Sequence, residues 1–197
     1  IGAATLYAAD YRWETWRLIS ARNTRTNLLL GKLATIAMLG LIALLVMLLA
    51  SVAEAVVKAS IFARPLTFEM EAKDIGGFFA LGGLGFLRVI QFTMLGMLTA
   101  VVTRSLLAAL FVPLVIAVAQ GLSPQLFGSM AMKPDDWLPM LVNPGASMDA
   151  LKAIASGASA ALPDGIAIKA WLSMALWTLL PLLGAIFWFN RQDLSKE

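Results

Sequence analysis

Long apolar runs alternate with short polar segments along this chain of 197 residues. The clearest run covers residues 33–57, and further runs cover residues 77–103, 105–123 and 166–189. Each is comparable to the ~20 apolar residues that cross a bilayer as a helix. The runs are rich in Leu, Ala, Val and Met without alternation, which favours helices over the strands of a barrel. The pattern predicts an all-α integral membrane protein, folded as a polytopic helical bundle.

The apolar region from residue 77 to residue 122 is too long for one crossing. As a single helix it would measure about 70 Å, whereas the hydrocarbon core is about 30 Å thick. Arg104 places a charge in this region, within the sequence Thr-Arg-Ser. We therefore expect the chain to reverse at Arg104, with one span ending at Thr103 and the next beginning at Ser105.

Two polar connections are expected on the outer side, at residues 58–76 and 124–165. In the second, Asn143 and Pro144 have the character of an N-cap and a first helical position. They predict a short amphipathic helix that lies on the membrane, with Met148, Leu151, Ile154 and Ala155 in its apolar stripe. Residues 190–197 are expected to form a cytoplasmic tail.

A basic segment, residues 10–32, precedes the first complete run. Its cationic residues are Arg12, Arg17, Arg22, Arg25 and Lys32. Trp13 and Trp16 are three positions apart and share a helical face. This composition predicts an amphipathic helix in the interface plane, and the density of cations next to a span places it on the cytoplasmic side. Residues 1–9 are apolar and begin with Ile, so we expect them to be the end of an earlier span whose N-terminal part is missing.

The amino-acid composition limits the kinds of functional site that this chain can contain. Sixty per cent of residues are hydrophobic and the mean hydropathy is +0.82, above the usual half-apolar composition of soluble domains. The net charge of +3 gives no indication of a nucleic-acid partner. The chain has neither cysteine nor histidine, and histidine is the commonest general base and metal ligand. We therefore predict no catalytic, metal or cofactor site in this chain.

Two charged residues lie within the apolar runs. Arg88 is roughly 24 Å from Arg104 along a helix, so snorkelling toward the outer headgroups is favoured over a buried functional charge. Glu54 lies near the outer end of its own span, and Glu54 with Arg88 is a candidate polar pair.

No nucleotide-binding loop is visible. Gly31-Lys32 is followed by Leu33, and the glycine-rich stretch at residues 76–85 lacks the Lys-Ser/Thr ending that a phosphate-binding loop requires. The centres of the predicted spans are also bare of the ionisable groups that ion-coupled transporters use. If the protein transports, its energy is expected to come from another subunit.

The basic segment resembles the cytoplasmic segment between the second and third spans of type-2 ABC exporter permeases. The matching residues are Asp10, Thr15-Trp16-Arg17, Arg25 and Gly31-Lys32. The stretch TRSLLAALF after Val102 and the ending RQDL at Arg191–Leu194 are also similar to the family. Glu14 departs from the pattern, since glycine is usual there, and Asp10 stands in place of the commoner Glu.

The resemblance implies a six-span permease whose first span or spans are missing from this chain, in the plasma membrane, as in the bacterial inner membrane. It implies a second permease subunit, identical or different, and two copies of an ABC ATPase that bind ATP and Mg. Residues 10–32 would be the coupling helix. The candidate contacts to the ATPase are Arg12, Glu14, Thr15, Trp16, Arg17, Arg22 and Arg25.

Two other functions remain open from the residues alone. The chain could be a membrane anchor or scaffold that holds an extracytoplasmic partner with its 124–168 loop. It could also be a channel that conducts without ATP.

Overall fold

The computed structural model describes residues 2–12, 24–63, 65, 72–158 and 162–192, and these residues form helices and connections without a strand. The helices are α1 (Gly2–Arg12), α3 (Arg25–Ile61), α4 (Ala72–Thr103), α5 (Leu106–Ser129), α6 (Trp137–Val142), α7 (Pro144–Ala155) and α8 (Ile166–Arg191). Among the described residues, α3, α4, α5 and α8 are long and apolar enough to cross a membrane. The prediction of an all-helical integral membrane protein is confirmed.

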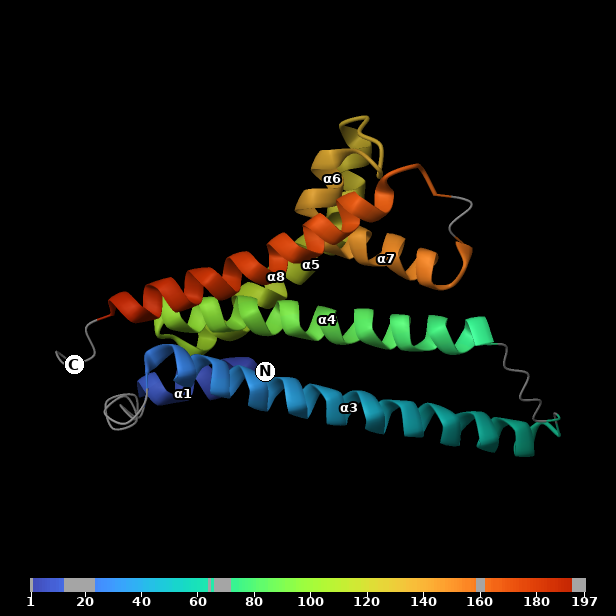
Figure 1. Ribbon diagram of the computed structural model, residues 1–197, viewed down its shortest axis with the longest axis horizontal. Helices are drawn as coiled ribbons and strands as arrows, with labels where there is room; N and C mark the ends of the chain where they lie inside the picture. The colour runs from blue at the N-terminus through green and yellow to red at the C-terminus, as the bar shows by residue number, and fades with distance from the viewer. Residues whose placement is uncertain (1, 13–23, 64, 66–71, 159–161, 193–197) are drawn as a thin grey trace.

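Helix α4 is the centre of the bundle. It packs against α8, α5, α7, α1 and α3, and Figure 1 shows α4 between α3 and α8. The main core joins α1, α3, α4 and α8 through buried side chains that include Tyr7, Leu29, Met97, Val101 and Phe189. This core lies toward the end of the bundle where α3 begins and α8 ends.

Helix α3 is longer than the predicted span. It begins at Arg25, where the Thr24 hydroxyl accepts a hydrogen bond from the Asn27 amide (3.3 Å). Residues 25–32 therefore belong to α3 rather than to a separate interfacial helix, because Leu29 is fully buried in the core. Residues 10–12 belong to α1, so the predicted helix over 10–32 is corrected at both ends. Its middle, residues 13–23, lies outside the described residues.

The outer connections are also shorter than predicted. Helix α3 continues to Ile61 and α4 begins at Ala72, so parts of the expected 58–76 loop are helical. Helix α5 runs through Pro124 to Ser129. At the other end, α4 ends at Thr103, Arg104 has a φ of +54°, and the Ser105 side chain caps α5 by accepting from the Ala108 amide. The reversal between α4 and α5 lies at the predicted residue.

Helix α7 begins where the sequence predicts, and its apolar stripe packs on other helices of the bundle. The Asn143 side chain accepts hydrogen bonds from the Gly145 and Ala146 amides, and Pro144 is the first helical residue. The apolar stripe, however, packs on α4 and α8, where Met148 and Leu151 are buried. The stripe therefore faces α4 and α8, and the position of α7 at the membrane surface stays a prediction.

Helix α7 runs antiparallel to the first half of α4. A Cβ atom added to Gly145 would lie 3.8 Å from Arg88 Nη2, and one added to Gly77 would lie 2.9 Å from the Ala155 carbonyl oxygen. The start of α7 is thus beside the middle of α4, and its end is beside the first turns of α4. Figure 1 shows α7 next to this half of α4.

Candidate functional site

A polar junction ties four helices together at the end of the bundle where α3 begins. We define it by Tyr7, Tyr11, Arg25, Lys32 and Gln192. Arg25 Nη1 donates to the carbonyl oxygens of Phe189 (3.3 Å), Asn190 (3.3 Å) and Gln192 (2.5 Å). A cation at this position binds carbonyls at the end of α8, where intrahelical donors run out, and it complements the negative end of the helix dipole.

Gln192 is the buried centre of the junction. Its Oε1 accepts from the Tyr11 hydroxyl (2.9 Å), and its Nε2 donates to the Val101 carbonyl oxygen (2.6 Å). The side chain is buried, so both ends of its amide are satisfied by other helices. Gln192 thereby connects the end of α8 to α1 and α4.

Two further contacts connect α1 to α3. The buried Tyr7 hydroxyl donates to the Leu29 carbonyl oxygen (3.3 Å). Lys32 Nζ donates to the Leu6 carbonyl oxygen (2.5 Å) and lies 5.9 Å from the centre of the Tyr7 ring. The two helices that flank residues 13–23 are therefore bonded to each other, and both are bonded to α8.

The predicted ATPase contacts are placed only in part. Arg12 ends α1, whereas Glu14, Thr15, Trp16, Arg17 and Arg22 lie outside the described residues. Arg25 is described, and its guanidinium binds α8 of the same chain. No local signal predicts this contact, because its partners are more than 160 residues away in sequence.

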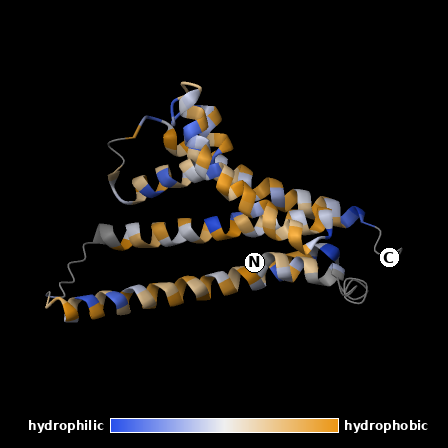
Figure 2. Cartoon of the chain, turned by 180° about the vertical axis from the view of Figure 1, so that it is seen from behind, coloured by the Kyte–Doolittle hydropathy of each residue, from blue (hydrophilic) through white to orange (hydrophobic). Residues whose placement is uncertain are grey.

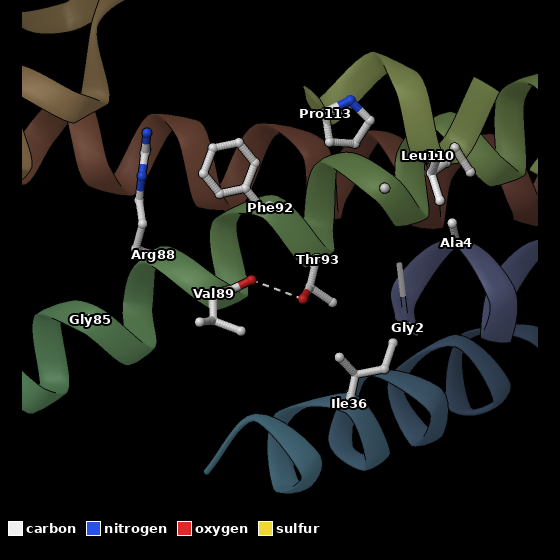
Figure 3. A pocket seen from close by; sticks show the side chains of 12 residues that line it. Gly2, Ala4, Ile36, Gly85, Arg88, Val89, Phe92, Thr93, Leu110 and Pro113 are labelled. Carbon is white, nitrogen blue, oxygen red and sulfur yellow. Dashed lines mark hydrogen bonds between the residues drawn. The ribbon is translucent and has the colours of Figure 1, made fainter. Parts of the chain in front are cut away.

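Arg88 is held inside the bundle by neutral side chains. Its Nη1 donates to Gln91 Oε1 (3.0 Å), its Nη2 donates to Gln120 Oε1, and its guanidinium carbon lies 4.6 Å from the centre of the Phe92 ring. Figure 3 shows the Arg88 side chain pointing away from Ile36 of α3. Glutamine acceptors on α4 and α5 thus bind the half-buried Arg88, and its reach toward the outer headgroups stays a prediction.

The surrounding hydrogen bonds extend this arrangement into a network. Gln91 Nε2 donates to the Met174 carbonyl oxygen (3.1 Å). Asn143 Nδ2 donates to Ser123 Oγ (2.7 Å) and to the Gln120 carbonyl oxygen (3.1 Å). We call Arg88, Gln91, Gln120, Ser123 and Asn143 the Arg88 cluster; it joins α4, α5 and α8 to the start of α7.

Glu54 does not pair with Arg88. Its Oε1 lies 2.6 Å from Lys58 Nζ, one turn later on α3, and both side chains are largely exposed. The candidate pair is therefore replaced by a local ion pair of α3. Arg88 has its contacts on α4 and α5 instead.

A cavity of about 410 Å³ lies between α1, α3, α4 and α5. Ile36, Val89, Leu110 and Pro113 give it an apolar wall, and Arg88 borders it (Figure 3). The Thr93 hydroxyl on this wall donates to the Val89 carbonyl oxygen (2.9 Å), so it has a partner within α4. Among the described residues, no group of acidic, histidine or cysteine side chains could hold a metal ion.

The comparison with known families agrees with the helical architecture. A family model described as "ABC-2 family transporter protein" matches residues 17–194, which include α3 to α8. No curated protein and no solved structure matches the chain. With the family matched over most of its length and its apolar helices in place, the chain belongs to the ABC-2 transporter family and is an integral membrane component of the permease type.

Proposed function

We propose that this protein is the membrane-spanning permease subunit of an ATP-driven exporter. Permeases of this family normally work with an ABC ATPase, and the family match supports the same arrangement here. In the full proposal the permease has six spans and pairs with a second permease. Two ATPase subunits bind ATP and Mg, and the assembly lies in the plasma membrane, as in the bacterial inner membrane.

The polar junction is the observation that carries the coupling part of the proposal. Residues 13–23 connect α1 to α3, and these two helices are bonded to each other through Tyr7 and Lys32. Gln192 and Arg25 then connect them to α4 and α8. A partner that displaces this connection would move several spans together, as in a rigid-body transition.

The proposed contact surface is the basic part of this connection. Arg12, Glu14, Thr15, Trp16, Arg17 and Arg22 are the candidates, with the arginines meeting acidic groups of the ATPase. Arg25 is assigned a different role, since its guanidinium holds the end of α8. Separating these roles matters for experiments, because a change at Arg25 would disturb the bundle itself.

The test is charge reversal in the connection. Replacing Arg17→Glu and Arg22→Glu together should weaken binding of the ATPase by more than about tenfold, since like charges at an interface oppose association. Binding is measured by co-purification from membranes at several salt concentrations, and ATP hydrolysis is measured on the purified complex. The matched control is Lys133→Glu with Lys152→Glu, which makes the same change in charge at exposed positions near the opposite end of the bundle.

Unchanged assembly and unchanged ATPase stimulation in the Arg17/Arg22 variant would overturn the contact assignment. Purification with an extracytoplasmic protein and without any ATPase would favour the scaffold function. Ion conductance by the purified chain in a bilayer without ATP would favour a channel.

A further inference from the structure

Arg88 carries a charge at a depth where charges are normally paired. At 1.5 Å per residue it lies about 22 Å along α4 from Thr103, within the ~30 Å thickness of a hydrocarbon core. Arginines at such depth usually have a carboxylate, a carbonyl or water as partner. The described partners of Arg88 are two glutamine oxygens and an aromatic ring, none of which is an anion.

Asp149 is the acidic residue of α7. Its side chain is 80% exposed and lies 3.8 Å from Lys152 Nζ, on the outward face of α7. It forms no hydrogen bond with Arg88 among the described contacts. Asp149 therefore supplies no ligand to the Arg88 guanidinium.

The start of α7 adds a second positive element beside Arg88. Helix N-termini carry a partial positive charge, and at the start of α7 the Gly145 and Ala146 amides already donate to Asn143 Oδ1. The first turn of α7 is close to Arg88, because a Cβ atom on Gly145 would lie 3.8 Å from Nη2. The glycine also means that no side chain of residue 145 separates the guanidinium from this turn. A cation next to a helix N-terminus is unfavourable unless an anion accompanies it.

Gln120 supplies a second donor beside Arg88. It is 7% exposed, and its Nε2 is buried without a hydrogen-bond partner. Arg88 determines how the Gln120 amide is oriented, because Gln120 Oε1 accepts a hydrogen bond from the guanidinium. If the amide were turned over, its NH₂ group would face the N–H donors of Arg88. The cluster thus has a buried amide donor beside a guanidinium and a helix N-terminus, and the missing group is an acceptor.

We propose that the Arg88 cluster binds an oxyanion, with Arg88 and Gln120 Nε2 as its donors beside the positive end of α7. A phosphate or carboxylate group has the charge and the acceptor oxygens for a guanidinium fork and for an amide. The group can arrive on the headgroup of an anionic lipid or as a free solute. This binding does not depend on the proposed coupling to ATP.

The experiment measures stabilisation by oxyanions of the full-length protein, purified with any subunits that accompany it. Thermal unfolding is compared in detergent with phosphatidylglycerol or phosphatidylcholine of the same acyl chains, and with inorganic phosphate or chloride at equal ionic strength. A bound anion raises the unfolding temperature in proportion to its occupancy. We expect a higher unfolding temperature with phosphatidylglycerol, with phosphate, or with both. A rise with phosphatidylglycerol identifies a lipid headgroup as the bound group, and a rise with phosphate identifies a free anion.

Three variants locate the effect. Arg88→Gln should weaken anion binding by roughly ten- to a hundredfold, as expected for the loss of charge-assisted hydrogen bonds. Gln120→Glu places a carboxylate beside Arg88, so it should raise the unfolding temperature without ligand and abolish the further rise with anion. Arg191→Gln removes an equal charge at the end of α8 and should keep the full response.

Equal unfolding temperatures in all four conditions for the wild-type protein would overturn the proposal. A rise that persists in both Arg88→Gln and Gln120→Glu would also overturn it. If Arg88→Gln does not fold, Gln120→Glu alone decides, because it keeps the size and the polar character of the native side chain.

Discussion

At the scale of single residues, Asn143 combines a local and a distant function. Its Oδ1 caps α7 by accepting from the Gly145 amide (2.9 Å) and the Ala146 amide (3.3 Å). Its Nδ2 donates to Ser123 and Gln120 on α5. The Asn-Pro sequence predicts the cap. The bonds to α5, by contrast, depend on packing between segments 20 or more residues apart. Both functions are needed to hold the start of α7 beside Arg88.

Replacing Asn143 should therefore separate the two functions. Asn143→Ala removes the cap and both hydrogen bonds to α5, so it should lower the free energy of unfolding by about 2–4 kcal/mol. Asn143→Ser keeps a capping oxygen and should lose roughly half as much. Denaturant unfolding of the purified protein measures both values. A serine variant as stable as the wild-type protein would show that the bonds to α5 contribute nothing.

At the scale of elements, the close approach of α7 to α4 depends on Gly77. A Cβ atom there would lie 2.9 Å from the Ala155 carbonyl oxygen, which is backbone and cannot turn aside. A Cβ atom added to Gly82, also on α4, would have no heavy atom within 4 Å. The end of α7 is thus positioned by the absence of a side chain on α4.

These two glycines give a matched pair of substitutions. Gly82→Ala should be neutral or stabilise the protein by up to about 1 kcal/mol, because alanine is the better helix former. Gly77→Ala gains the same propensity but must displace the end of α7, so it should be the less stable variant by about 1–3 kcal/mol. Equal unfolding free energies for the two variants would contradict the packing of α7 on α4.

The apolar helices could be predicted because a membrane span is encoded by its own length and composition. The reversal at Arg104 followed in the same way, from a charge within an apolar region. The start of α3 at Arg25 could not be predicted, because it depends on the burial of Leu29 against α1 and on carbonyls of α8. The Arg88 cluster was missed for a related reason: Gln120 lies 32 residues from Arg88, and nothing in either sequence neighbourhood shows that they meet.

At the scale of the whole molecule, α3 presents an almost continuous apolar surface. In this helix Leu29 and Ile36 are the buried residues, and Leu45, Met47 and Leu49 are each more than 60% exposed. Figure 2 shows hydrophobic residues along the length of α3. A surface of this size requires lipid or a second helical subunit to cover it, which fits both the membrane placement and a permease pair.

The orientation of the bundle can be tested with single cysteines, because the native chain has none. Thr103→Cys lies at the end of α4 near the polar junction, and Ser156→Cys lies beyond α7; both positions are exposed. With the basic segment in the cytoplasm, a membrane-impermeant maleimide should label Ser156→Cys in intact cells. It should label Thr103→Cys only after permeabilisation. The reverse pattern would contradict the proposed orientation.

In the proposed mechanism, ATP that binds to a partner ATPase moves these spans through residues 13–23. The most direct measurement is the distance between spin labels attached at Ser156→Cys on two paired permeases, purified with their ATPase. We expect this distance to change when ATP binds. Arg17→Glu with Arg22→Glu should remove the change, whereas Lys133→Glu with Lys152→Glu should preserve it. A distance that is unchanged by ATP, or that changes equally in both double variants, would contradict coupling through residues 13–23.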